Sequence, residues 1–163
     1  MSDAPRLVGF EELSAAAVRD RLVARRAEFW AGSMLGEDAV LALHDPIFFH
    51  QLGGFGAVAL TGTGTGTDAG YLLGVVSADR LAVVHALAVH PDQRRRGLAT
   101  RLLTRFATLA SEVGARVLQG VAHPGDDAVH GLAGRLGAHA AVSPGHAGPG
   151  EDRVLFTRSL PLD

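Results

Sequence analysis

The sequence predicts a single α/β domain, residues 1–163, with a mixed sheet, and three observations support this prediction. The chain has 163 residues, enough for one hydrophobic core and too few for two domains. Hydrophobic residues make up 47% of it and charged residues 20%, which is a globular composition. Segments with helical and strand patterns alternate along the chain, as is typical of α/β proteins.

Two helical segments are expected in the first third of the chain. From Phe10 to Trp30 the apolar residues recur at helical spacing with charges between them, which predicts an amphipathic helix. A second helical segment is expected over residues 37–52, where Pro46 begins a new turn.

A hairpin is expected next, with strands over residues 55–62 and 69–77. The repeat from Thr61 to Thr67 resembles a phosphate loop, but it lacks the Gly-Lys-Ser/Thr ending and no helix follows it. The repeat is therefore interpreted as the connection of the hairpin.

The second half of the chain begins with a continuous apolar run over residues 80–90, which predicts a strand buried on both faces in the middle of the sheet. The residues that follow predict a helix with one apolar stripe, then a strand, a second helix and a final strand. These elements are expected over residues 97–114, 115–122, 126–136 and 153–160.

Composition excludes several classes of function. The net charge of −2 argues against nucleic acid as the main partner, because such proteins need a broad basic surface. The absence of Cys excludes disulfides, thiolate catalysis and Cys-based zinc sites, and the eight scattered His residues imply no metal site. No segment has the pattern of a signal peptide or a membrane span, so a cytoplasmic protein without a membrane partner is expected.

The stretch "HPDQRRRGLATRLL", His90 to Leu103, predicts an anion site. A loop of small residues between a strand and a helix leaves backbone N–H groups free at the helix start, where the helix dipole also favours negative charge. One such contact is worth about 0.3–1 kcal/mol, whereas micromolar binding needs about 8 kcal/mol. The loop is therefore expected to belong to a larger site that holds a phosphate group.

The residue types in this loop distinguish between families of phosphate-binding proteins. Neither G-x-G-x-x-G nor G-x-x-x-x-G-K-[ST] is present, but "RRRGLA" fits R-x-x-G-x-A and follows a strand that ends in "LAVHP". Here the chain resembles the GNAT superfamily of N-acetyltransferases, from about Phe55 to Leu160. It is particularly similar to small actinobacterial-type members with "DP-x-FF" and "GPGEDRVLF" segments.

The resemblance implies a mostly antiparallel central sheet, flanked by helices, with a splayed central strand. It also implies a helical acceptor-side region over residues 10–52 and a cofactor-binding core over residues 55–160.

The resemblance further implies acetyl-CoA as the co-substrate and assigns its contacts. The pyrophosphate would bind the backbone N–H groups of Arg95, Arg96, Gly97, Leu98, Ala99 and Thr100. The side chain of Arg94, Arg95 or Arg96 would reach the 3′-phosphate. The pantetheine would pair with the strand end at Leu87, Ala88 and Val89, where the N–H of Val89 polarises the thioester carbonyl.

The proton donor of the family is missing. Aligned without gaps, Asp126 stands at the position of an Asn that contacts the cofactor, and Ala133 at that of a catalytic Tyr. Three explanations remain open: the thiol leaves without an acid, His130 on nearly the same helix face replaces the Tyr, or the protein binds the cofactor without efficient catalysis. Asp126 is equally well interpreted as a helix cap.

His85 is the candidate general base, because it interrupts an apolar strand two residues before the thioester-contacting segment. A hydrogen-bonded core histidine is the alternative. Glu151 and Asp152 are interpreted either as a base relay that attracts a cationic acceptor or as a solvated turn. Phe48, Phe49 and His50 are interpreted as lining the acceptor side or as core residues.

The resemblance predicts an acetyl-CoA-dependent N-acetyltransferase that acts on a primary amine by direct attack in a ternary complex, because a chain without Cys has no thioester relay. The alternative is a coenzyme A-binding regulatory module with little or no turnover. The acceptor is a small molecule or a peptide that the sequence does not identify. Dimers are common in the family, so a homodimer is among the assemblies that the resemblance allows.

Overall fold

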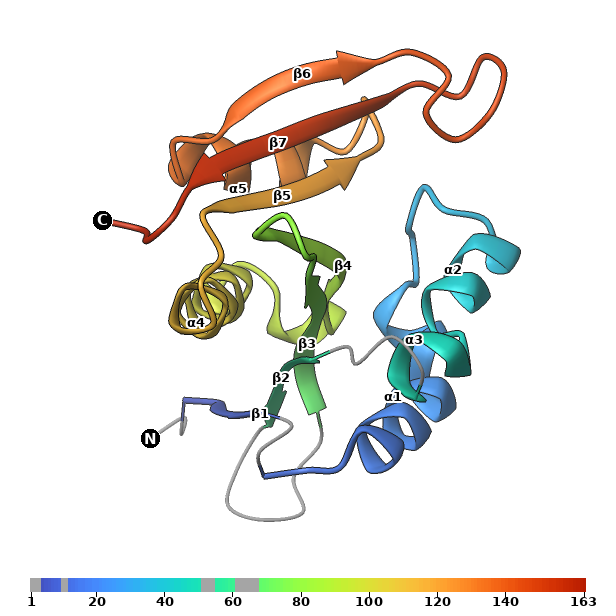
Figure 1. The fold of residues 1–163 in the computed structure, drawn as a ribbon. Helices are drawn as coiled ribbons and strands as arrows, with labels where there is room; N and C mark the ends of the chain where they lie inside the picture. The colour runs from blue at the N-terminus through green and yellow to red at the C-terminus, as the bar shows by residue number, and fades with distance from the viewer. Residues whose placement is uncertain (1–3, 10–11, 51–54, 61–67) are drawn as a thin grey trace. The chain divides into compact units, whose positions relative to one another are not determined.

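A computed structural model describes residues 4–9, 12–50, 55–60 and 68–163 of the chain, and Figure 1 shows them as a ribbon. Helices and strands alternate among them, so the predicted mixed α/β class is confirmed. The expected connection from Thr61 to Thr67 lies outside these residues. The elements are, in chain order, β1 (Arg6–Gly9), α1 (Ala15–Phe29), α2 (Glu37–Leu43), α3 (Pro46–His50), β2 (Phe55–Leu60), β3 (Asp68–Val76), β4 (Leu81–Val89), the 3₁₀-helix η1 (Pro91–Gln93), α4 (Leu98–Glu112), β5 (Val117–Ala122), α5 (Asp127–Arg135), β6 (His139–Ser143) and β7 (Arg153–Ser159).

The strands of the described residues pair in the order β1-β2-β3-β4-β5-β7-β6. The pairs β1–β2, β2–β3, β5–β7 and β6–β7 are antiparallel, whereas β4 and β5 are parallel. The sheet is therefore mixed and mostly antiparallel, as expected.

The parallel pairing between β4 and β5 is short. Only Leu81 to Val83 of β4 pair with Val117 to Gln119 of β5, although β4 continues to Val89. A pairing that stops this early is what the expected splayed central strand requires, because the second half of β4 then keeps an edge for another partner.

The chain divides into two compact units, of which the first contains residues 1–75 and 85–106. Its core joins β1, α1, α3, β3 and β4, and Figure 1 shows α1, α2 and α3 beside one another in this unit. The buried members are Val8, Val18, Leu22, Phe29, Phe48, Tyr71, Leu73, Ala86 and Ala88. Each large apolar side chain buried here stabilises the fold by about 1.5–3 kcal/mol.

Two local signals set the helix boundaries in this unit. The helix predicted from Phe10 begins at Ala15 instead, because the hydroxyl of Ser14 caps it by accepting from Ala17 N at 3.1 Å. The segment predicted as one helix over residues 37–52 contains two, and Pro46 begins the second, as predicted. Proline fits a first helical turn because it has no N–H to leave unpaired.

The strand β4 lies in the middle of the described sheet, as predicted, but the prediction that it would be buried on both faces is wrong, because β3 is the strand with that burial. Residues 68–74 of β3 are all buried. In β4 the small residues Ala82, Ala86 and Ala88 are buried, whereas the larger side chains of His85, Leu87 and Val89 are partly exposed. An apolar run alone does not reveal this difference, because it does not show which face a neighbouring element covers.

The second unit contains residues 76–84 and 107–163. Its small core lies between α5 and the strands β5 and β7, which Figure 1 shows with β6 beside β7. Its buried members are Ala122, Ala133, Val154 and Phe156. The strands β1 and β6 were not predicted individually, because each is short and the exposed residues of β6 show no alternation of apolar and polar types.

A buried chain of hydrogen bonds is centred on Tyr71 in the first unit. Trp30 Nε1 donates to the Tyr71 hydroxyl at 2.6 Å, and that hydroxyl lies 2.8 Å from His44 Nε2. His44 Nδ1 lies 2.7 Å from the carbonyl oxygen of Val40, which only accepts, so Nδ1 carries the proton of the neutral ring. Tyr71 therefore donates to Nε2, and each of these polar groups has a partner.

Replacing Tyr71 with Phe should lower the free energy of unfolding by about 1–3 kcal/mol, because Trp30 then loses its acceptor and His44 its donor inside the core. Urea unfolding followed by the fluorescence of Trp30, the single Trp of the chain, measures this change. Equal stability of Tyr71→Phe and the wild type would show that the network contributes nothing.

The free energy of unfolding should also fall as the pH drops below about 6.5. Burial lowers the pKa of His44 and of His85 from that ordinary value, so below it the unfolded chain binds more protons than the folded one. The stabilisation is complete above about pH 6.5 and is lost as the pH falls through the folded-state values. Urea titrations at pH 7.5 and pH 5.0 measure the change, which should shrink in His44→Gln.

Candidate functional site

The loop between β4 and α4 has the backbone shape of an anion cradle. Arg95 has a φ of 62° and Gly97 a φ of 75°, so two left-handed residues alternate with Arg96 just before the helix. Alternating backbone conformations turn successive N–H groups toward one side, which forms a concave anion-binding surface. A Cβ on Gly97 would meet no atom within 4 Å, so the space in front of this residue is open.

The amides at the end of this loop and in the first turn of α4 have no acceptors in the described part of the chain. On one side Gln93 N donates to His90 O and Arg94 N to Pro91 O, and on the other Arg101 N donates to Gly97 O. Between them, the N–H groups of residues 95–100 have no acceptor among the residues that the structure describes. Six consecutive free donors at a helix N-terminus suit a diphosphate, whose oxygens only accept.

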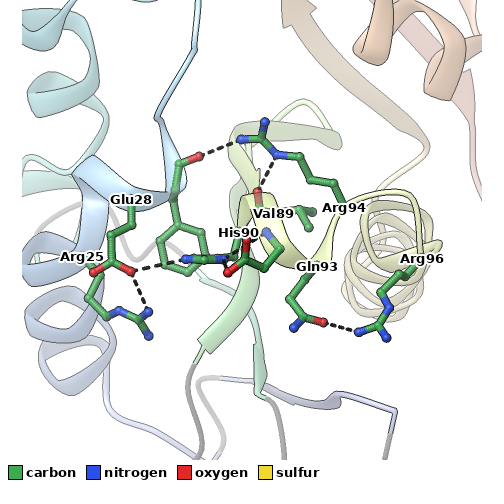
Figure 2. A network of polar contacts seen from close by, with 9 residues as sticks. Arg25, Glu28, Val89, His90, Gln93, Arg94 and Arg96 are labelled. Carbon is green, nitrogen blue, oxygen red and sulfur yellow. Dashed lines mark hydrogen bonds and ion pairs between the residues drawn. The ribbon is translucent and has the colours of Figure 1, made fainter. Parts of the chain in front are cut away.

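The three arginines of the loop have different environments, which Figure 2 shows for Arg94 and Arg96. Arg94 donates through Nε to Val89 O at 3.1 Å and through Nη2 to Phe29 O at 3.3 Å. Arg96 donates to the side chain of Gln93 at 2.8 Å. The guanidinium of Arg95 has no partner in the described part of the chain, so it is the arginine best placed to meet a ligand.

The end of β4 offers backbone groups to a ligand. His90 N donates to Ala69 O of β3 at 2.8 Å, and Ala88 O lies so near Gly70 that an added Cβ there would be 2.8 Å from it. Neighbouring residues of a strand direct their N–H and C=O groups to opposite edges. The N–H of Val89 is therefore directed away from β3, as contact with an extended ligand would require.

The side chain of His85, in β4, contacts residues of α2 and α3. Its Nε2 is 3.0 Å from Leu43 O, and its ring stacks on Phe48 with centroids 4.0 Å apart and planes 11° apart. Burial lowers the pKa of His85, and its hydrogen bond to Leu43 only partly opposes this effect. The ring is therefore neutral at pH 7 with its proton on Nε2, which leaves the lone pair of Nδ1 available.

The bond between His85 and Leu43 was not predicted. The two residues are 42 positions apart, and a backbone carbonyl carries no signal in the sequence. Phe48 is buried against His85, which supports its interpretation as a core residue. The side chains of Phe49 and His50 lie outside the described part of the structure.

Asp126, His130 and Ala133 lie in the second unit. Asp126 caps α5, because its carboxylate accepts from Val129 N at 3.1 Å, as its alternative interpretation predicted. The His130 ring packs edge-on against Phe156 and its Nε2 lies 3.4 Å from His123 O. Ala133 is buried in the cluster that contains Phe156, so its position on the helix is a packing position.

Glu151 and Asp152 stabilise the turn between β6 and β7. Asp152 accepts from Gly145 N at 2.8 Å, and Glu151 forms an ion pair with Arg153 at 3.3 Å. Both carboxylates belong to exposed residues. These contacts support the interpretation of the pair as a solvated turn.

A groove of about 670 Å³ lies on the surface of the first unit between α1 and the α2–α3 segment. Its lining contains apolar side chains and charged side chains of both signs. The charged residues are Arg19, Asp20, Arg26 and Asp45, and His44 also lines the groove. A groove with this mixture does not select a ligand of one charge. Its residues belong to the predicted acceptor-side region.

Two kinds of structure are absent from the described residues. No helix there is long and apolar enough to cross a membrane. No group of three or more His, Asp or Glu side chains there is arranged to hold a metal ion.

Solved structures share this fold over nearly the whole chain. A protein assigned to the GNAT family from Desulfovibrio desulfuricans has a TM-score of 0.76 at 19% identity, covering 97% of this chain and 100% of its own. The ribosomal-protein-S18-alanine N-acetyltransferase from Escherichia coli has a TM-score of 0.66 at 19% identity, covering 98% of this chain and 96% of its own. A Salmonella typhimurium protein assigned as an acetyltransferase, solved with acetyl-CoA, has a TM-score of 0.63 at 19% identity, covering 98% and 95%. At this identity the likeness concerns the fold alone.

The sequence itself identifies the family. No curated protein sequence matches the chain. The model of the acetyltransferase (GNAT) family, however, matches residues 21–138, which is more than half of the chain and includes the loop with its free amides. This chain belongs to the GNAT family of acetyltransferases.

Proposed function

We propose that the protein is an acetyl-CoA-dependent N-acetyltransferase that transfers the acetyl group to a primary amine by direct attack in a ternary complex. The observation that carries the proposal is the row of free amides over residues 95–100, in a chain that belongs to a family using acetyl-CoA. The whole chain, residues 1–163, would act as one such domain.

The cofactor contacts follow from the free backbone groups. The pyrophosphate would accept hydrogen bonds from the amides of residues 95–100, and the side chain of Arg95 would meet the 3′-phosphate. The pantetheine would lie along the edge of β4 at Leu87, Ala88 and Val89, with Asp126 as a further predicted contact. The N–H of Val89 would donate to the thioester oxygen as negative charge develops on it.

His85 would act as the general base. The acceptor nitrogen must be neutral to attack, and the free Nδ1 of His85 would take the proton from its ammonium form, directly or through water. The nitrogen then forms a C–N bond to the thioester carbon. The positively charged nitrogen of the resulting tetrahedral intermediate gives a second proton to solvent. The intermediate then collapses by breaking the C–S bond, so the sulfur leaves with the electron pair.

The thiolate would leave without a dedicated acid. A thiol has a pKa of about 8.5, so its anion is a tolerable leaving group near neutral pH and takes a proton from solvent. The burial of Ala133 supports this assignment, because a packing position presents no proton donor. His130 is the alternative donor from the sequence, and its role stays a prediction.

The acceptor would bind on the side of residues 10–52. The Escherichia coli structural neighbour is named for an alanine acceptor, which makes a peptide with N-terminal alanine a reasonable first candidate. Acetyl-CoA is an intracellular metabolite, so the proposal implies a cytoplasmic enzyme. The homodimer stays a prediction from the resemblance.

Release of free thiol from acetyl-CoA in the presence of an amine panel tests the proposal. The panel contains a peptide with N-terminal alanine, an aminoglycoside and a diamine, and calorimetry gives the affinity for acetyl-CoA. Acceptor-dependent thiol release supports the enzyme. Micromolar binding of acetyl-CoA with no release by any acceptor would favour the regulatory module, and the absence of binding would contradict both.

The Gly97→Glu variant should lose detectable binding of acetyl-CoA, because a carboxylate would occupy the position of the pyrophosphate. Calorimetry measures the loss. The control is Gly114→Glu, since Gly114 also has a positive φ, 92° against 75°, and equally open space at its Cβ position. That control carries similar backbone strain and should keep the wild-type affinity. Wild-type affinity in Gly97→Glu would remove the loop from the site.

The His85→Gln variant separates catalysis from packing, because the Gln amide can still donate to Leu43 O but binds no proton near neutral pH. We expect kcat/KM to fall by about 10²- to 10⁴-fold. In the wild type, kcat/KM should decrease as the pH falls through the pKa of His85, which burial places below its ordinary value of about 6.5.

The pH profile of kcat/KM, recorded with one acceptor for both proteins, should lose this acidic limb in His85→Gln. If His85→Gln behaves as the wild type while His85→Ala is impaired, the residue has only a packing role.

A further inference from the structure

The guanidinium of Arg94 connects two elements of the first unit at their carboxyl ends. It donates to the carbonyl oxygen of Phe29, the last residue of α1, and to that of Val89, the last residue of β4. Figure 2 shows the two bonds leaving one side chain in different directions. A carbonyl at a helix C-terminus has no partner within the helix, so Arg94 also caps α1.

Other contacts support the same junction. Glu28 Oε2 accepts from Arg25 at 2.8 Å and lies 3.3 Å from His90 Nε2, as Figure 2 also shows. The rings of Phe29 and His90 meet edge to face, with centroids 5.7 Å apart. The last turn of α1 is therefore joined to the residues after β4 by both side-chain and backbone contacts.

The bond to Val89 O also constrains the neighbouring N–H group. Within a strand, the N–H and C=O of one residue are directed toward the same edge. Arg94 occupies the carbonyl of Val89 on the edge directed away from β3, and the N–H of Val89 on that same edge has no acceptor among the described residues. Fixing the carbonyl limits rotation of the backbone at Val89, and so limits the direction of the N–H.

We propose that Arg94 is a positioning residue, which holds the end of α1 and the amide of Val89 in one geometry and does not bind the 3′-phosphate. This inference rests on the proposed function, in which that amide contacts the thioester oxygen. The arginines of the loop then have different roles. Arg94 supports the backbone, and Arg95, which has no partner among the described residues, would bind the charged group of the ligand. An acceptor bound beside α1 would then face a thioester of fixed orientation.

The shape of the side chain matters to this role, in addition to its charge. A guanidinium presents several N–H donors in a rigid fork, so one Arg reaches two carbonyls that lie in different directions. A lysine ammonium carries its three donors on one nitrogen, so it does not reproduce the geometry in which Nε and Nη2 reach different carbonyls. Arg94→Lys therefore keeps the charge and loses the bridge, whereas Arg94→Ala loses both.

The thioester carbonyl itself reports the geometry. Acetyl-CoA labelled with ¹³C at the carbonyl carbon should show a changed chemical shift on binding to the wild type, because Val89 N–H polarises that carbonyl. In Arg94→Ala and in Arg94→Lys the signal of the bound label should return toward the value of free acetyl-CoA. Arg101→Ala, which removes a charge from the first turn of α4 and leaves both carbonyl contacts, should keep the wild-type signal.

Two further measurements separate positioning from binding of the 3′-phosphate. Affinities for coenzyme A and for 3′-dephospho-coenzyme A should change by the same factor in Arg94→Ala, whereas the loss of a ligand of the 3′-phosphate would affect only the first. With an acceptor found in the panel, kcat should fall by about 10- to 100-fold, the size of effect that misplaced reacting groups produce. Wild-type thermal unfolding curves for Arg94→Lys serve as the check that the fold is intact.

The outcomes bear separately on the two proposals. An unchanged carbonyl signal in both Arg94 variants, or a loss of affinity confined to coenzyme A, would overturn the positioning role while leaving the acetyltransferase intact. If the wild type binds no acetyl-CoA, the proposed function fails instead.

Discussion

A row of backbone donors, the N–H groups of residues 95–100, has no acceptors in the part of the chain that the structure describes, and the rest of the site depends on this row. A folded chain normally pairs such groups, and the cost of leaving one buried and unpaired is about 1–3 kcal/mol. Here the residues from Arg94 to Gly97 are exposed, so water can satisfy the free amides of residues 95–97 at little cost, whereas Leu98 is buried. A diphosphate would replace that water with charged acceptors, which makes the loop a binding site without any specialised side chain.

The neighbouring structure keeps these donors available. Left-handed conformations at Arg95 and Gly97 hold the loop open, and the side chain of Arg94 is directed back to Val89 and Phe29, away from the amides of its own loop. The parallel pairing of β4 ends at Val83, which leaves the second half of that strand able to receive a ligand by strand addition. The most basic segment of the chain thus uses one arginine for internal support.

The sequence predicted what depends on local pattern and missed what depends on contacts between distant residues. The loop, Pro46 at a helix start and the cap at Asp126 follow from residue types at fixed spacing, and the structure has all three. The bonds from Arg94 to Phe29 and from His85 to Leu43 involve backbone carbonyls, which any residue can supply, so no letter indicates them. Burial of β3 in place of β4 likewise depends on which helices cover each face.

A site built largely from backbone groups changes how its residues should be interpreted. Where donors are amides, side-chain identity matters through shape and support: Gly97 by leaving space, Arg94 by holding two carbonyls, and Leu43 by fixing the tautomer of His85. In the proposed function the thiolate leaves without a dedicated acid, which agrees with the burial of Ala133, whereas the Val89 N–H would be the donor to the oxyanion. Under the proposed function the rate would depend on the direction of the Val89 N–H, so Arg94 would contribute to catalysis without contacting the substrate.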